Sequence, residues 1–161
     1  MVERVQGLNK LVRARGCLLL LLAAALAAPT QAAVEISGAW VRAMPPTQSM
    51  TAAYLTLYNS GSEAVTVVGA HSPLAASVEM HQSVERDGMA RMVSLASVPL
   101  APGARAEFVP GGRHLMLMGL ERMPETGEQV SLCVELASGE QVCTEAPVQR
   151  DAGGAAHAHH H

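Results

Sequence analysis

Hydrophobic and polar residues alternate along most of the chain, in short segments separated by turn residues. Alternation with a period of two is typical of strands that have one face in a core and the other in solvent. We expect nine strands, at residues 34–42, 51–58, 64–70, 77–84, 89–97, 104–109, 114–120, 129–136 and 141–146. The segments between them are rich in Pro, Gly, Asn and Ser, and none after the first 32 residues has a helical period. The pattern therefore predicts an all-β sandwich or small barrel.

The first 32 residues depart from this pattern. A basic start is followed by an apolar run at residues 17–28 and then by small residues, which is the arrangement of a secretory signal peptide. The run is too short for a lasting membrane span. Cys17 stands at the start of this run instead of after it, which argues against lipidation. We expect residues 1–32 to be a leader cleaved after Ala32 or one residue later, giving a periplasmic protein with no membrane contact.

Removing this leader changes the charge of the chain. Seven arginines, no lysine and thirteen acids remain, which is a formal charge of −6. An acidic protein of this kind is a poor partner for nucleic acids or anionic membranes. The remaining length suits one domain, residues 33–149, which we expect to be a monomer. Its few aromatic residues leave Val, Leu, Ala and Met to fill the core.

Two imidazoles and two thioethers fall within one β-rich stretch, at His81, Met92, His114 and Met116. Thioether sulfur is soft and suits Cu(I) far better than Zn(II), Mg(II) or Ca(II), and neutral imidazole also binds copper. In a strand over residues 113–118, His114, Met116 and Met118 share one face and the leucines between them share the other. Each residue alone could be core filler or surface, but the paired spacing favours a metal site.

A hairpin supplies the other pair. Residues 78–84 and 89–95 read as its two strands, and Glu85-Arg86-Asp87-Gly88 is a tight-turn signal. The midpoint between positions 81 and 92 falls inside this turn. We therefore expect His81 and Met92 to lie opposite each other, within about one residue of register, and to complete a His2Met2 site. Met80 should point to the opposite face, into the core.

The stretch resembles the copper motif of the PCu(A)C family of periplasmic copper chaperones: His, ten residues, Met, twenty-one residues, His-x-Met. The flanking Gly38-Ala39-Trp40 and Gly111-Gly112-Arg113 are also similar, and the resemblance covers residues 34–148. It implies a cupredoxin-like Greek-key β-barrel or sandwich of about eight or nine strands that carries Cu(I) in the periplasm. The recipient it implies is the binuclear copper site of cytochrome c oxidase, in subunit II, with a Sco-type thiol protein as a further partner.

Three other features bear on metal chemistry. Met44 and Met50 flank a proline-containing loop and are weak candidates to lie near the metal, while His71 reads as an exposed loop-edge residue. Cys133 and Cys143 are centred on the Ala137-Ser138-Gly139 turn and should face each other across a hairpin. A structural disulfide or an idle thiol pair is favoured over a thiolate copper site, because no His is near either cysteine in sequence.

The last residues, 150–161, read as a flexible His-rich tail. A natural metal-binding segment is favoured over the remnant of a purification tag, since the leader is still present and the final run of His is not six long. Imidazoles without thioethers would suit Cu(II). The tail histidines are His157, His159, His160 and His161.

Three functions are compatible with a copper site. The first is a Cu(I) metallochaperone, and the second is a periplasmic buffering or resistance protein that sequesters copper. The third is an enzyme, such as a copper oxidase or thiol oxidoreductase. We expect no enzyme, because the sequence has no Cys-x-x-Cys, no blue-copper cysteine and no recognisable nucleophile–base spacing.

Overall fold

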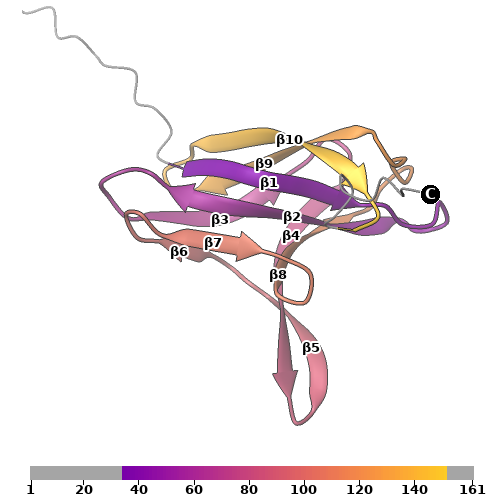
Figure 1. Cartoon of the computed structure of the whole chain (residues 1–161), viewed down its shortest axis with the longest axis horizontal. Helices are drawn as coiled ribbons and strands as arrows, with labels where there is room; N and C mark the ends of the chain where they lie inside the picture. The colour runs from indigo at the N-terminus through magenta and orange to yellow at the C-terminus, as the bar shows by residue number, and fades with distance from the viewer. Residues whose placement is uncertain (1–33, 152–161) are drawn as a thin grey trace, which may run out of the picture. The chain divides into compact units, whose positions relative to one another are not determined.

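A computed structural model describes residues 34–151 of the chain, which form an all-β domain (Figure 1). Ten strands follow one another, and none of the described residues forms a helix with the length and hydropathy of a membrane span. The strands are β1 (Val34–Arg42), β2 (Met50–Asn59), β3 (Val65–His71), β4 (Ser77–Arg86), β5 (Met89–Ser94), β6 (Val98–Leu100), β7 (Arg105–Phe108), β8 (Arg113–Met118), β9 (Gln129–Leu136) and β10 (Gln141–Gln149).

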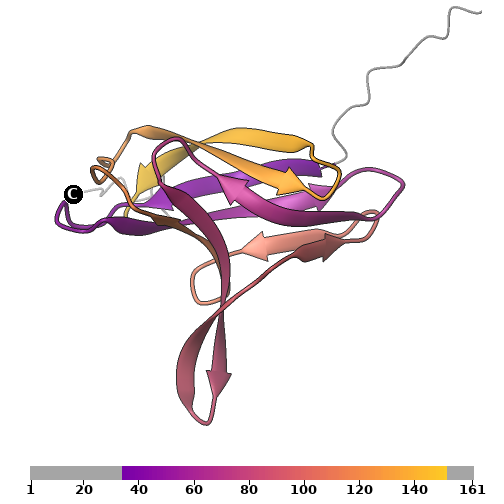
Figure 2. The same cartoon turned by 180° about the vertical axis from the view of Figure 1, so that it is seen from behind.

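The strands pair in the order β5-β4-β8-β7-β2-β1-β10-β9-β3-β6, with further pairings of β8 to β2 and of β4 to β3. The pairing of β3 with β4 closes the sheet on itself, through Ala70 and Val78. Most neighbours are antiparallel, but β1 and β10 run parallel, as do β7 and β8. This closed, two-layered arrangement confirms the predicted all-β, cupredoxin-like class, although it is not a regular barrel (Figures 1 and 2).

Alternation along the strands decides which side chains form the core. In β8, Leu115 and Leu117 are fully buried, whereas Met116 and Met118 are only partly covered. Met80 of β4 is 4% exposed and belongs to the core cluster, as its parity predicts. Leu55, Leu57 and other aliphatic residues complete the core together with Phe108. The sheet therefore has an apolar inner face. Along β4 and β8, its other face carries glutamate, histidine and methionine side chains.

The β4–β5 hairpin projects away from the closed part of the sheet (Figures 1 and 2). It turns through Asp87 and Gly88, which both have positive φ, the backbone conformation that Asp-Gly favours in a two-residue hairpin turn. β5 lies at an end of the strand order, so β4 is its one partner strand in the described domain. All of its residues except Val93 are exposed.

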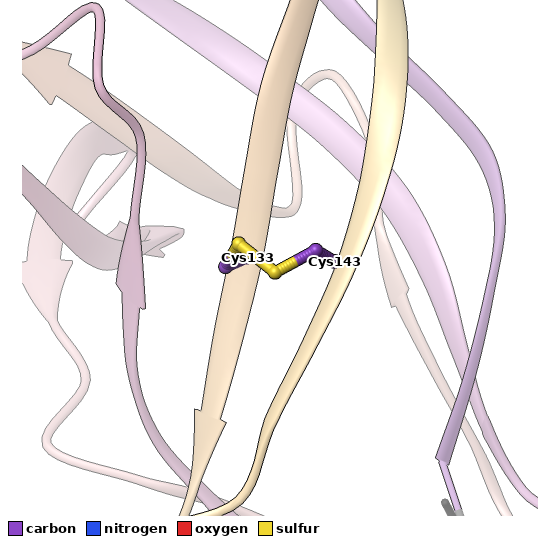
Figure 3. The surroundings of a disulfide bond; sticks show 2 residues. All are labelled: Cys133 and Cys143. Carbon is purple, nitrogen blue, oxygen red and sulfur yellow. A yellow bond between two sulfur atoms is a disulfide. The ribbon is translucent and has the colours of Figure 1, made fainter.

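The β9–β10 hairpin carries the disulfide. Cys133 and Cys143 are directly paired, and their sulfur atoms are bonded at 2.00 Å (Figure 3). The bond joins two strands that already pair along seven positions. This confirms the facing cysteines predicted from the turn, and it removes both thiols from metal binding.

The predicted strands agree with the structure closely. Residues 34–42 and 129–136 match to the residue, and the other expected segments each coincide with a strand. The additional β6 has three residues, one of which is Pro99. The leader at residues 1–32 and the His tail lie outside the described residues, apart from Arg150 and Asp151, and remain predictions.

Candidate metal centre

The two core histidines come together from separate strands. In the antiparallel pairing of β4 with β8, His81 lies directly opposite His114. Their ring centroids are 6.0 Å apart, with the planes at 64°. A metal bonded to two imidazoles lies about 2 Å from each nitrogen. The separation therefore leaves room for one ion between the rings.

His114 has one ring nitrogen committed to the backbone. Its Nδ1 lies 3.0 Å from the carbonyl oxygen of Gly112. A carbonyl only accepts, so Nδ1 carries the proton and donates it, and Nε2 keeps its lone pair. The ring is 5% exposed, so its orientation is held by packing as well as by this bond. Fixing a ligand's tautomer through its second nitrogen is a regular feature of metal-binding histidines.

In His81 the other ring nitrogen, Nε2, makes the hydrogen bond. Its Nε2 lies 2.8 Å from Oε2 of Glu79, two residues earlier on the same face of β4. A carboxylate accepts this bond, which assigns the proton to Nε2 and the lone pair to Nδ1. That Nδ1 atom is buried and has no hydrogen-bond partner among the described residues. A buried nitrogen without a partner is costly unless something else binds it. The donor set thus fits a metal ion.

The thioether of Met116 lies beside this pair. Met116 follows His114 by two residues, so the two side chains share the outer face of β8. It is directly opposite Glu79 on β4 and opposite Ala52 on β2. The side chain is partly buried. The structure therefore brings His81, His114 and Met116 together on one face of two paired strands.

Met92 is placed differently from the prediction. It pairs with Ser83, and His81 pairs with Ser94, so the expected direct pairing of His81 with Met92 is wrong by two residues. The turn is centred between Asp87 and Gly88, one residue later than the centre of the turn signal, and this shifts the pairing by two residues. A shift of two keeps the parity, so Met92 still lies on the face of His81, as its diagonal neighbour. Met92 is 55% exposed.

The other residues considered as metal ligands lie in different parts of the domain. Met50 pairs with Met118 on the outer face, whereas Met44 lines a surface hollow with Met123 and Pro124. His71 ends β3 and is exposed, as expected, but it lies directly opposite Cys133, so the expectation that no His is near either cysteine holds only along the sequence. Within residues 34–151, no three His, Cys, Asp or Glu side chains are grouped to hold a metal ion, so the candidate centre rests on imidazoles and thioethers.

Glu79 and Gly112 are functional candidates that the sequence analysis misses. The signal for Glu79 is its position two residues before His81, which places both side chains on one face of the strand. Beyond Ala52 on the same face, Trp40 and Tyr54 stack with ring centroids 4.5 Å apart, and the Arg42 guanidinium lies over both rings. Burial raises the pKa of Tyr54, and Arg42 opposes part of that rise.

Sequence comparison finds related proteins over most of the chain. The family model described as "Putative lipoprotein LpqE-like" matches residues 34–148. "Putative lipoprotein Lxx21020" of Leifsonia xyli subsp. xyli is 36% identical over 140 residues, covering 86% of this chain and 83% of that protein. An uncharacterised protein of Rickettsia prowazekii, RP573, is 32% identical over 55% of this chain and 51% of its own length.

Solved structures show the same fold. The Cu(I) form of DR1885 from Deinococcus radiodurans is 32% identical, with a TM-score of 0.53 over 80% of this chain and 83% of that one. The copper-bound PCuAC domain of PmoF2 is 21% identical, with a TM-score of 0.61 over 73% of this chain and 92% of that domain. These similarities confirm the resemblance to PCu(A)C proteins that the sequence motif indicates.

Proposed function

The chain belongs to the LpqE-like family, and we propose that it is a periplasmic metallochaperone that binds Cu(I) and delivers it to the binuclear copper site of cytochrome c oxidase. The observation that carries the copper site is the pair of opposed imidazoles. Each has one nitrogen committed to a protein acceptor, and Met116 lies beside them. The Cu(I) form of DR1885, which shares the fold and nearly a third of its sequence, supports the choice of metal.

The ligands in this proposal are His81, Met92, His114 and Met116. Two thioethers favour Cu(I) over Cu(II), so copper is carried without a change of oxidation state. None of the four donors is a thiolate, which keeps the affinity finite and the bonds exchangeable. Met92 is the most exposed of the four and is the donor that an acceptor reaches first. A thiolate of the acceptor replaces Met92, and the other three donors follow one at a time.

The electrostatics of the site suit a cationic cargo. The Glu79 carboxylate accepts a hydrogen bond from His81 and adds a negative charge next to the ion. This lowers the energy of a bound cation and holds the His81 ring with Nδ1 free. The Cys133–Cys143 disulfide lies on β9 and β10, not on the three strands that carry the proposed donors.

Export is part of the proposal. The apolar run at residues 17–28 acts as a cleaved leader, and the protein then resides in the bacterial envelope. Two of the matching descriptions carry the word lipoprotein, which raises lipid attachment at Cys17 as the competing outcome. The mass of the exported protein distinguishes them, because a cleaved chain begins near Ala33, whereas a lipoprotein retains Cys17 and its acyl groups.

The decisive experiment is copper transfer. The processed chain, loaded with one equivalent of Cu(I), is mixed with the apo copper domain of oxidase subunit II, with and without a Sco-type protein. Appearance of copper in the acceptor at a rate above that of free Cu(I) release supports delivery. Tight binding of one equivalent without transfer to either acceptor would identify the protein as a copper buffer. Failure to bind Cu(I) would refute both functions.

A further inference from the structure

A second set of thioethers lies next to the proposed copper site. Met50 begins β2 and Met118 ends β8, and the two are directly paired across the strands. One step along the same face, Met116 pairs with Ala52. Met116 therefore neighbours both Met118, two residues along its own strand, and Met50, on the diagonal. Three thioethers occupy neighbouring positions, and one of them, Met116, belongs to the proposed His2Met2 site.

The outward direction of these side chains follows from parity. Leu115, Leu117 and Ala53 face the core and are fully buried. Met116, Met118 and Met50 alternate with core-facing or buried neighbours and point to the other side of the sheet. Met50 is 45% exposed and Met118 is partly exposed, so solvent reaches both. Packing in the core does not account for methionine at these two positions.

Distance and flexibility allow the pair to share an ion. Directly opposed residues of an antiparallel pair have Cβ atoms about 4.5–5.5 Å apart. A methionine side chain has three rotatable bonds, so two opposed sulfur atoms can approach a common ligand from above the sheet. The other residue paired with Met118 is Ser77 of β4, so neither residue directly paired with Met118 is ionisable.

We propose that Met50 and Met118, with Met116 as a shared third donor, form a second and weaker Cu(I) site that adjoins the first. The inference rests on the proposed function, in which copper reaches this face as Cu(I). A site made only of thioethers is selective for Cu(I), and protons do not compete with copper for its donors. Its affinity for Cu(I) is lower than that of a site that includes imidazole. Copper passing between the two sites keeps its bond to Met116, while bonds to Met50 and Met118 replace those to His81, His114 and Met92. It stays Cu(I) throughout, so no electron is transferred.

Methyl NMR of the processed chain tests this inference site by site. Cu(I) is diamagnetic, and the His-rich tail contains no methionine, so every Met methyl signal comes from elsewhere in the chain. The first equivalent of Cu(I) should shift the methyl signals of Met92 and Met116. Further Cu(I) should then shift Met50 and Met118 and leave exposed Met89 unchanged. Raising the pH from 6 to 8 should strengthen the first event and not the second.

The double variant Met50→Leu/Met118→Leu removes the two thioether donors that belong only to the second site. The fold should be kept, since Leu nearly preserves the volume of Met. The double variant should keep the shifts of the first equivalent and lose the weaker binding, while Met89→Leu keeps both. The inference is overturned if excess Cu(I) shifts Met44 and Met89 as much as Met50 and Met118, or shifts none of them. If Met92 and Met116 fail to respond to the first equivalent, the proposed function fails, and the response of Met50 and Met118 still decides this inference separately.

Discussion

His81 and His114 oppose each other across β4 and β8, yet they leave different ring nitrogens free: Nδ1 in His81 and Nε2 in His114. The difference arises because one ring donates to the Glu79 carboxylate and the other to the Gly112 carbonyl. An ion between the two rings is therefore bound by two chemically distinct imidazole nitrogens. The pair is symmetric in register but not in coordination.

This asymmetry predicts which nitrogens respond to copper. Nitrogen-15 NMR of the histidine side chains should show Cu(I)-dependent shifts at Nδ1 of His81 and Nε2 of His114. Nε2 of His81 should remain protonated, because it donates to Glu79. Coordination of His81 through Nε2 would require that hydrogen bond to break and would contradict the assignment.

Methionine substitutions test the thioether donors. Met116→Leu and Met92→Leu should each lower Cu(I) affinity by about tenfold or more, equivalent to about 1.4 kcal/mol, with the fold intact because Leu nearly matches Met in volume. The larger loss is expected for Met116, which is partly buried beside His114. Competition against a Cu(I) chelator measures the affinities. Met80→Leu, in the core, is the control, and a copper defect in that variant would refute the parity argument.

Removal of Glu79 should weaken copper binding without removing a ligand. Glu79→Ala leaves Nε2 of His81 without its acceptor and deletes a negative charge near the ion, so Cu(I) affinity should fall about 10–100-fold. The exposed Glu145→Ala on β10 provides a matched loss of charge on a strand that carries none of the proposed donors. Equal affinities in the two variants would mean that the Glu79–His81 bond has no part in binding.

The pH dependence of Cu(I) affinity separates imidazole from thiolate ligands. Copper competes with protons for imidazole but not for thioethers. Affinity should therefore fall as the solution becomes more acidic, with up to two protons taken up per copper released, and should level off where both imidazoles are neutral. Chelator competition from pH 5 to 9 measures this profile. Affinity that continues to rise beyond pH 8 would identify a cysteine ligand and contradict the disulfide.

The disulfide should stabilise the fold and not the copper site. The two cysteines are ten residues apart in the sequence. For a loop of this length the chain-entropy model gives a stabilisation of about 2–3 kcal/mol. Cys133→Ser/Cys143→Ser should lower the free energy of unfolding in urea by about that amount while leaving Cu(I) affinity unchanged. A loss of affinity in a variant that remains folded would assign the cysteines a role in metal binding.

The sequence predicts this fold well because alternation reports burial directly, as in β8, where Leu115 and Leu117 face the core. The facing cysteines are predictable for a similar reason, since a hairpin with a short turn fixes its own register. The position of Met92 is harder to predict from the sequence, because Glu85-Arg86-Asp87-Gly88 accommodates turns of two or four residues. Only the backbone shows that Asp87 and Gly88 form the whole turn.

Other features lie beyond sequence reasoning altogether. The strand β6 is too short, and its central residue is a proline, so no alternation marks it. The cross-strand pairings of β8 with β4 and with β2 join segments far apart in the chain. Without them, neither the opposition of His81 and His114 nor that of Met50 and Met118 can be deduced. The hydrogen bond from His114 to Gly112 likewise depends on the local path of the backbone.

The edge position of β5 bears on how quickly copper leaves the site. Three of the proposed donors lie on β4 and β8, which are paired on both sides, whereas Met92 lies on a strand with one neighbour in the described domain. Edge strands of this kind open locally at lower free energy than strands within a closed sheet. Substitutions at Asp87 or Gly88 that loosen the hairpin should raise the dissociation rate of Cu(I) and leave the identity of its ligands unchanged. The time that Cu(I) stays bound should thus depend on a turn that does not contact the ion.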